Sequence, residues 1–290
     1  MGLAQTEIVI LTLKHYMKKA RKTILRAAGI LLIAYILLCL CYYSFQEKFL
    51  FTNTRPTSYA YHFDNQFEEH NIQTKDGKKL NGLLFRSSSS KGLVFYLHGG
   101  GHALDKWGQY AGTYLKLGYD IFFLDYRGFG KSEGNVPTEK QLYSDVQDAY
   151  NNLKGSYQED RIVVLGYSFG TAAAAMLAAH NSPKLLILQA PYYNGDEAVK
   201  GNYPFLYAII PSFLLKYKLK VNEFVKGTQA PIVILHGRND STFSVAQAYR
   251  LKALLKPTDE LTVLDKQGHD HFTENPAYSI ELERIFSKYP

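Results

Sequence analysis

A serine flanked by glycines is the feature of this sequence whose chemistry is easiest to name. Residues 166–170 read Gly-Tyr-Ser-Phe-Gly, after the apolar run Ile-Val-Val-Leu and before the alanine-rich run TAAAAMLAAH. Gly-x-Ser-x-Gly between a strand and a helix is typical of a sharp turn that exposes the serine hydroxyl at the helix N-terminus. The alternative is a serine that only caps the helix. The strand, turn and helix context favours Ser168 as a nucleophile.

A serine hydroxyl needs a general base, and the base needs a carboxylate that orients it. Asp240 follows the apolar run PIVILHG, and His269 follows LTVLDKQG. Both residues come after the serine, in the order nucleophile, acid, histidine that is found on strand-turn-helix serine hydrolases. We therefore predict that Asp240 is the acid and His269 the base.

Three neighbours compete for these roles. His271 is the alternative base, although His269 comes directly after the Gly268 turn. Asp265 and Asp270 are the alternative acids, but both lie beside the base in sequence, whereas Asp240 is better placed to reach across. Asp240 itself could instead cap the helix that follows it.

A glycine-rich loop follows the strand LVFYL and reads His-Gly-Gly-Gly-His over residues 98–102. Glycines let a backbone approach a substrate oxygen closely, so this loop is suited to an oxyanion hole. We predict that the N–H groups of Phe169 and Gly100 are the donors. His98 and His102 are expected to brace the loop rather than to act as bases. The residues predicted to contact the substrate are His98, Gly99, Gly101, Tyr167 and Phe213.

The elements that must position these residues alternate along the chain. Strands are predicted from six apolar runs, at 92–99, 119–128, 161–168, 184–192, 230–237 and 260–268. Helices are predicted between or after them, at about 106–117, 138–154, 170–181, 244–256 and 276–288. Alternation of this kind predicts a doubly wound, mostly parallel sheet. A β-hairpin over 67–86 is predicted to precede it.

One segment, about 193–228, is too long for a simple connection and is predicted to form a small cap. Its apolar run, Tyr203 to Leu215, has two interpretations. The run packs into the core, or part of it, including Phe213, lines an acyl pocket over Ser168. Because the cap is short, we expect a shallow pocket that favours short or medium acyl groups.

The N-terminal region differs from the rest of the chain. Residues 27–46, Ala27 to Gln46, carry no charge, and twenty helical residues span about 30 Å, the thickness of a bilayer core. We predict a basic cytoplasmic arm at 1–26, a transmembrane helix at 27–46 and a catalytic domain at 47–290. A buried helix or a cleaved signal peptide is the alternative. Six basic residues precede the span, whereas only Lys48 and Arg55 follow closely, so the N-terminus is expected in the cytoplasm and the domain on the other side.

Composition excludes several classes of protein. The net charge is +7, but residues 1–46 contain six basic side chains and one acid, so the globular part is close to neutral. That distribution argues against nucleic-acid binding. The only cysteines, Cys39 and Cys41, lie in the apolar stretch, which leaves no cysteine nucleophile or thiolate metal site in the domain. His269-Asp270-His271 is a poor metal motif. No metal, no cofactor and no obligate protein partner is expected.

Taken together, these motifs resemble the α/β-hydrolase superfamily. The resemblance covers about 60–290 and rests on the HGGG loop, DYRGFGKSEG at 125–134, GYSFG, HGRND and the final Gly-His. It is closest to the membrane-anchored Bem46-like, serine-aminopeptidase-type hydrolases. The resemblance implies the α/β-hydrolase fold, with Ser168, Asp240 and His269 as nucleophile, acid and base. One departure is the HGGGH loop, where that group often has an asparagine.

The expected function is hydrolysis of carboxylic esters or thioesters through an acyl-enzyme, with a small-molecule acyl substrate. An exopeptidase of the aminopeptidase type is the alternative, and it would need an acid such as Asp196 or Glu197 to bind the substrate amine. A third hypothesis is a binding module without catalysis on the same fold. The complete set of serine, acid, histidine and glycine loop argues against that third hypothesis.

Overall fold

The computed structural model describes residues 2–50 and 60–290, which belong to two compact units, Met1–Gln46 and Glu47–Pro290. Helix α1 (Gly2–Leu50) forms nearly all of the described N-terminal region. Its segment Glu7–Lys48 is long and apolar enough to cross a membrane, and the predicted span Ala27–Gln46 lies inside it. Length and composition of this kind fit a membrane anchor, and signal sequences share them.

The second unit is built on one eight-stranded sheet in the order β1-β4-β6-β5-β7-β8-β9-β10. Strands β5 to β10 run parallel, while β1 and β4 add an antiparallel edge. A mostly parallel sheet is therefore confirmed. The strands of the sheet are β1 (Phe67–Glu69), β4 (Gly82–Phe85), β5 (Leu93–Leu97), β6 (Asp120–Leu124), β7 (Ile162–Tyr167), β8 (Leu185–Gln189), β9 (Ile232–Gly237) and β10 (Glu260–Leu264).

The predicted hairpin is confirmed as two ladders in series. Strand β1 pairs with β4, and β2 (Ile72–Gln73) pairs with β3 (Lys79–Leu80) nearer the turn. The His70 N–H donates to the Gly82 carbonyl between the two ladders, at 2.9 Å.

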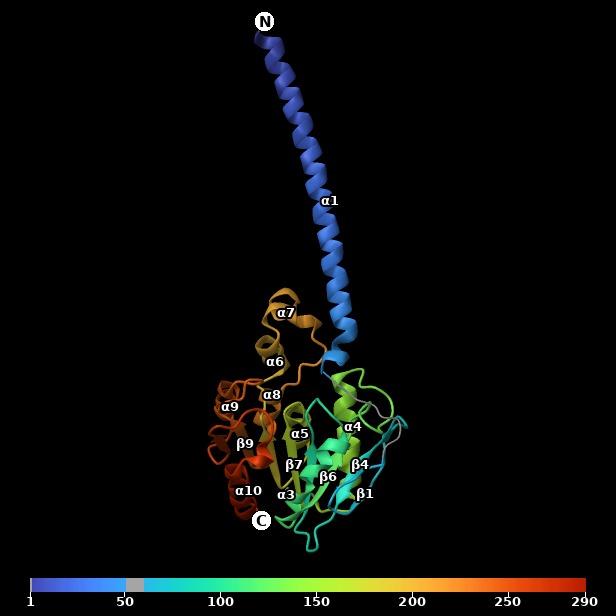
Figure 1. Cartoon of the computed structure of the whole chain (residues 1–290), viewed down its shortest axis with the longest axis vertical. Coiled ribbons are helices and arrows are strands. Elements are labelled where there is room, and N and C mark those ends of the chain that lie inside the picture. The colour runs from blue at the N-terminus through green and yellow to red at the C-terminus, as the bar shows by residue number, and fades with distance from the viewer. Residues whose placement is uncertain (1, 51–59) are drawn as a thin grey trace. The chain divides into compact units, whose positions relative to one another are not determined.

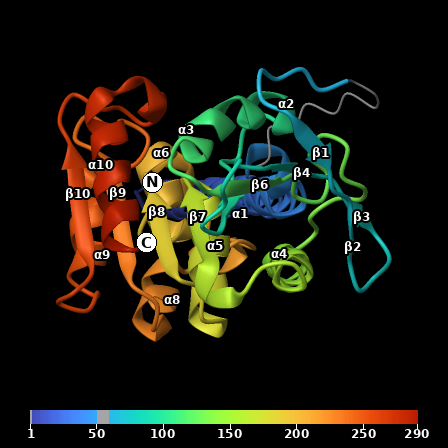
Figure 2. The same cartoon turned by 90° about the horizontal axis from the view of Figure 1, so that it is seen from below.

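Helices cover both faces of the sheet (Figures 1 and 2). One face carries α4 (Glu139–Lys154), α5 (Gly170–His180), α8 (Val221–Gly227) and α9 (Val245–Lys252). The other carries α2 (Leu104–Trp107), α3 (Ala111–Leu115) and α10 (Pro276–Lys288). Strand β5 shows why its residues are apolar throughout: Phe95 packs into the first core and Tyr96 into the second. Strands with helices on both faces bury both sets of side chains.

The helix predicted at about 106–117 is present as a continuous helical stretch from Leu104 to Leu115, whose middle turn is 3-10 rather than α. Between α2 and α3 lies a turn of 3-10 helix, Gly108–Tyr110. Gly108 lies against the ring of Phe63, so closely that a Cβ on it would come within 2.4 Å of that ring. A side chain at position 108 would therefore displace the Phe63 ring, so this close approach requires glycine.

The connection from β8 to β9 contains the predicted cap. It begins with α6 (Gly195–Asn202) and α7 (Pro204–Ile209), followed by a 3-10 turn at Ser212–Leu214 and then α8. Val221 and Val225 of α8 belong to the core beneath the sheet, so α8 is the crossover helix that returns the chain to β9. The additional structure is thus α6, α7 and the 3-10 turn, which start at the carboxyl end of β8 (Figure 1).

Candidate active site

Ser168 lies in a strained turn between β7 and α5. Its φ is +51°, in the left-handed region that a residue with a side chain seldom adopts. A Cβ on Gly170 would come within 2.0 Å of the Leu97 carbonyl oxygen, and one on Gly166 within 2.6 Å of the Gly170 carbonyl oxygen. Both flanking glycines are therefore required by space. They allow α5 to start directly against the end of β5, which brings Ser168 close to the glycine loop.

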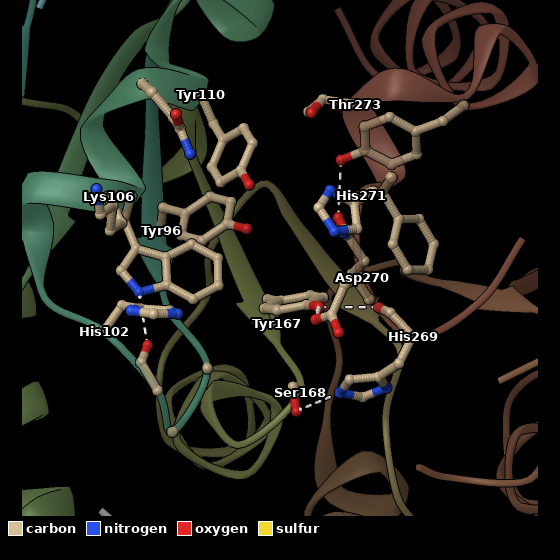
Figure 3. A pocket seen from close by; sticks show the side chains of 18 of the residues that line it. Tyr96, His102, Lys106, Tyr110, Tyr167, Ser168, His269, Asp270, His271 and Thr273 are labelled. Carbon is tan, nitrogen blue, oxygen red and sulfur yellow. Dashed lines mark hydrogen bonds between the residues drawn. The ribbon is translucent and has the colours of Figure 1, made fainter. Parts of the chain in front are cut away.

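His269 lies beside this serine (Figure 3), and Asp240 lies beside His269. The distance between Ser168 Oγ and His269 Nε2 is 2.9 Å, and His269 Nδ1 lies 2.7 Å from Asp240 Oδ2. The Asp240 carboxylate is fully buried, and the imidazole is nearly so. The three side chains form one continuous chain of hydrogen bonds, from carboxylate to hydroxyl.

Asp240 is held by the backbone that follows it. Its Oδ1 accepts hydrogen bonds from the N–H groups of Thr242 and Phe243, at 2.8 and 2.7 Å. These bonds leave Oδ2 directed at His269. His236 Nε2 lies 3.5 Å from Oδ2 and donates to the Phe243 carbonyl at 2.8 Å. Burial lowers the pKa of His236, so this side chain stays neutral behind the carboxylate.

The competing residues have other partners. His271 is exposed, and its Nδ1 lies 2.7 Å from Glu274 Oε1. Asp265 forms an exposed ion pair with Arg238. Asp270 Oδ1 accepts a hydrogen bond from the Tyr167 hydroxyl, at 2.7 Å. Among the described residues these contacts leave Asp240 and His269 as the pair that reaches Ser168.

The glycine loop is braced from behind by His98. This side chain is completely buried, with Nδ1 2.7 Å from the Gly99 carbonyl oxygen and Nε2 3.4 Å from Asp125 Oδ1. The Tyr126 hydroxyl donates to the His98 carbonyl, at 2.8 Å. Burial raises the pKa of Asp125, although the facing His98 works against that rise. His102, by contrast, is exposed at the other end of the loop.

A cavity of about 520 Å³ opens beside Ser168. Gly99, Gly100, Gly101 and Tyr167 line it, as does His269. Two of the predicted substrate contacts do not: His98 is buried beneath the loop, and Phe213 lies in the cap with 79% of its surface exposed. The volume lies within the range of small-molecule sites, roughly 300–1,000 Å³.

The wall opposite His269 was missed by the sequence analysis. This wall comes from the end of β5 and from the helical stretch Leu104–Leu115. Figure 3 shows its side chains across the cavity from Asp270, His271 and Thr273. Its aromatic residues are Tyr96, Trp107, Tyr110 and Tyr114. The Trp107 indole donates to the Gly101 carbonyl at 3.0 Å, which connects this wall to the glycine loop. Within residues 2–50 and 60–290, no group of three or more His, Cys, Asp or Glu side chains could hold a metal ion.

Comparison with known proteins identifies relatives of this chain. The family model for serine aminopeptidase, S33, matches residues 88–226. Human alpha/beta hydrolase domain-containing protein 17B is 28% identical over 73% of this chain and 72% of its own length. Protein bem46 of Schizosaccharomyces pombe is 26% identical, with 75% of this chain and 77% of the relative covered. The chain is an α/β-hydrolase of the Bem46-like type.

Two further similarities are to enzymes. Lysophosphatidylserine lipase ABHD12 of Macaca fascicularis is 28% identical over 64% of this chain, which spans half of the lipase's length. The esterase Pf2001 of Pyrococcus furiosus has the same fold, with a TM-score of 0.66, 19% identity, and coverage of 82% of this chain and 97% of the esterase. The chain is thus a serine hydrolase of the α/β-hydrolase fold.

Proposed function

We propose that this α/β-hydrolase cleaves carboxylic esters through an acyl-enzyme, with Ser168 as nucleophile, His269 as base and Asp240 as the acid that orients it. The observation that carries the proposal is the unbroken chain of hydrogen bonds from Asp240 through His269 to Ser168 Oγ, at the edge of the cavity. The proposed substrate class also includes thioesters, because esters and thioesters are cleaved by the same attack on a carbonyl carbon.

In the acylation step Ser168 Oγ attacks the ester carbonyl carbon while His269 Nε2 takes the hydroxyl proton. The carbonyl oxygen becomes an oxyanion, and the N–H groups of Phe169 and Gly100 are proposed to stabilise it. Asp240 remains ionised and stabilises the imidazolium through Nδ1–H. When the tetrahedral intermediate collapses, the bond to the alcohol oxygen breaks and His269 returns its proton to that oxygen. The products are the free alcohol and an ester of Ser168.

Deacylation repeats the sequence with water. His269 removes a proton from the water, the resulting hydroxide attacks the acyl carbon, and the second intermediate collapses with Ser168 Oγ as leaving group. The proton on Nε2 goes to that oxygen, which restores the enzyme and releases a carboxylic acid. The net reaction consumes one ester and one water.

We propose that the cavity binds the acyl part of the substrate, and that its volume limits the size of the acyl group. Its aromatic wall would bury apolar surface, and about 0.8 kcal/mol is gained for each buried CH₂. Binding energy that is realised in the transition state raises kcat/KM by roughly tenfold for two added carbons, until the cavity is full. The lipase relative acts on a lipid by its name, so lipid esters belong to the proposed class.

The exopeptidase alternative has less support. Asp196 and Glu197 were the acids considered for binding a substrate amine. In the structure Asp196 lies 3.5 Å from Lys218 Nζ, and Glu197 lies 3.3 Å from the Arg250 guanidinium. Both carboxylates therefore already have cationic partners within α6 and its neighbours.

A fluorophosphonate probe tests the proposal, because it reacts only with an activated serine. We expect labelling of the full chain in membranes, and its complete loss in Ser168→Ala. The matched control is Ser156→Ala, which removes an exposed serine after α4 and should label normally. A panel of acyl esters, thioesters and aminoacyl amides of increasing length then identifies the class. Unchanged labelling of Ser168→Ala would show that the nucleophile lies elsewhere.

We also propose that α1 is a membrane anchor, with the N-terminus in the cytoplasm and the catalytic unit on the opposite side. The support is the excess of basic residues before the apolar stretch. Protease added to sealed vesicles whose cytoplasmic side faces inward should digest the catalytic unit. Complete protection, with full-length chain recovered, would reverse the proposed orientation.

A further inference from the structure

The cap carries an unusual group of exposed apolar side chains. Outside α1, six large apolar side chains are exposed in the described part of the chain, and four of them lie between Tyr203 and Phe213. Phe205 has 86% of its surface exposed, Phe213 79% and Tyr203 52%. We call these three residues the cap patch. Exposed apolar residues that are scattered singly need no explanation, but aromatic residues gathered on one short segment do.

The exposure follows from how the segment is built. Pro204 starts α7 and Pro211 follows it, so the chain turns twice within a few residues. Within the segment Ile210 and Leu215 are buried, at 6% and 7% exposure. Phe205 and Phe213 are left on the outside. Neither residue lines the cavity beside Ser168, so the acyl pocket does not account for them.

The character of the patch favours a lipid surface. Phenylalanine and tyrosine are residues that reside at the boundary between headgroups and acyl chains. The cap segment 193–228 also contains five lysines against three acidic residues. Three of these lysines form ion pairs, Lys216 with Glu47, Lys218 with Asp196 and Lys220 with Glu223, so the exposed aromatic side chains carry the argument. Exposed aromatic side chains are typical of segments that lie in a bilayer interface.

The chain supplies a second reason to choose lipid as the occupant. It carries its own helix long and apolar enough to cross a membrane, and only thirteen residues separate Gln46 from Ala60. Thirteen residues reach at most about 45 Å even when fully extended. A unit tethered by so short a segment to a membrane-spanning helix meets the bilayer at a high effective concentration, which favours lipid as the occupant.

We infer that the cap patch enters the interface of the bilayer in which the chain is anchored, and gives the catalytic unit a second contact with lipid. This contact is separate from α1 and does not depend on which side of the membrane the unit occupies. The contact also deepens the proposed function and rests on it in this one respect: it would hold the unit that contains Ser168 close to esters dissolved in the bilayer.

A depth measurement on the full chain in phosphatidylcholine vesicles tests the contact without any use of activity. Cys39 and Cys41 are first replaced by serine, and a single cysteine is introduced as Phe205→Cys for an environment-sensitive fluorophore. The matched control is Ile280→Cys, because Ile280 is equally apolar, 68% exposed, and lies on α10 away from the cap. A nitroxide on the lipid acyl chain should quench the label at 205 at least about threefold more than the label at 280, since interfacial segments sit about 5–10 Å into the boundary.

Equal quenching at the two positions would overturn the inference. A label at 205 that is shielded from water but not quenched by lipid would overturn it as well, because a second copy or another protein would then cover the patch. Neither outcome depends on whether the chain hydrolyses esters.

Activity supplies the second measurement. Phe205→Ser should lower the hydrolysis of a long-chain ester embedded in vesicles about tenfold, with kcat/KM for a water-soluble short ester unchanged within about twofold. An equal fall with both substrates would place Phe205 in the catalytic unit's own machinery and contradict the inference. Absence of activity toward every ester in the wild type would instead count against the proposed function, and the quenching result would stand apart from it.

Discussion

Replacing Asp240 by asparagine separates the proposed catalytic role of this residue from its structural one. In the structure Oδ1 accepts two backbone N–H bonds, and Oδ2 accepts the bond from His269. An asparagine that keeps its oxygen on the backbone donors must present its NH₂ group to His269 Nδ1. The imidazole then carries its proton on Nε2, where it cannot accept the proton of Ser168. We expect kcat to fall by about 10³- to 10⁴-fold, with little change in stability.

Asp240→Ala gives the contrast. It leaves the buried N–H of Phe243 and the part-buried N–H of Thr242 without acceptors, and each orphaned group costs up to about 1–3 kcal/mol. The free energy of unfolding should therefore fall by about 2–6 kcal/mol in Asp240→Ala and by much less in Asp240→Asn. Ester hydrolysis and thermal unfolding, measured on both variants, distinguish the two effects. If Asp240→Asn kept more than a tenth of wild-type kcat while Asp270→Asn lost activity, the acid would be Asp270 and the reasoning would be refuted.

Three other predictions follow from single features. His269→Ala should reduce kcat at least about 10³-fold while His271→Ala stays near wild type, and the reverse result would exchange their roles. Gly170→Ala should destabilise the fold by about 3 kcal/mol, because its Cβ meets backbone, whereas Gly201→Ala in an open part of α6 should be neutral or slightly stabilising in the same denaturant titration. Burial lowers the pKa of His236 from its ordinary 6.5. Below about pH 6.5 the unfolded chain therefore binds a proton that the folded chain does not, and the free energy of unfolding decreases as the pH is lowered. His236→Gln should flatten that slope by up to about 1.4 kcal/mol per pH unit in unfolding measured from pH 7 to 5, and an unchanged slope would contradict the assignment.

The strands and the order of the candidate residues could be predicted because both are local properties of the sequence. A strand buried on both faces is a short apolar run, and each of the six runs contains one strand of the sheet. Ser168, Asp240 and His269 were selected by the strand that each follows, and parallel strands bring their carboxyl ends to one edge. The geometry that joins them is consistent with that choice, while their catalytic roles remain the proposal tested above.

The walls of the cavity could not be predicted, because they depend on packing between segments that are distant in sequence. Trp107 and Tyr110 belong to a stretch whose pattern indicates one amphipathic helix, and nothing in that pattern tells which of its aromatic rings line the cavity beside Ser168. The exposure of the apolar cap residues could not be predicted for a related reason. An apolar run predicts burial, and nothing in the pattern of 203–215 distinguishes a face that packs on protein from one that meets lipid.

The strand order explains why the histidine loop has to fold back over the sheet. Neighbouring strands lie about 4.8 Å apart, so β7 and β10, which are separated by β8 and β9, have ends about 14 Å apart. His269 reaches Ser168 only because the loop after β10 crosses the end of β9. The Asn239 N–H donates to the Gln267 carbonyl at 2.9 Å, which holds the loops of the acid and of the base together.

The crossing also fixes one residue at the end of β9. A Cβ on Gly237 would come within 2.4 Å of the Gly268 carbonyl oxygen and 2.5 Å of that of Gln267, so a larger residue would push the histidine loop away from Asp240. Lys266, with a φ of +60°, supplies the turn that starts the crossing. The distance between Asp240 and His269 is therefore set by backbone contacts between two loops, and the side chains complete a geometry that glycine at 237 makes possible.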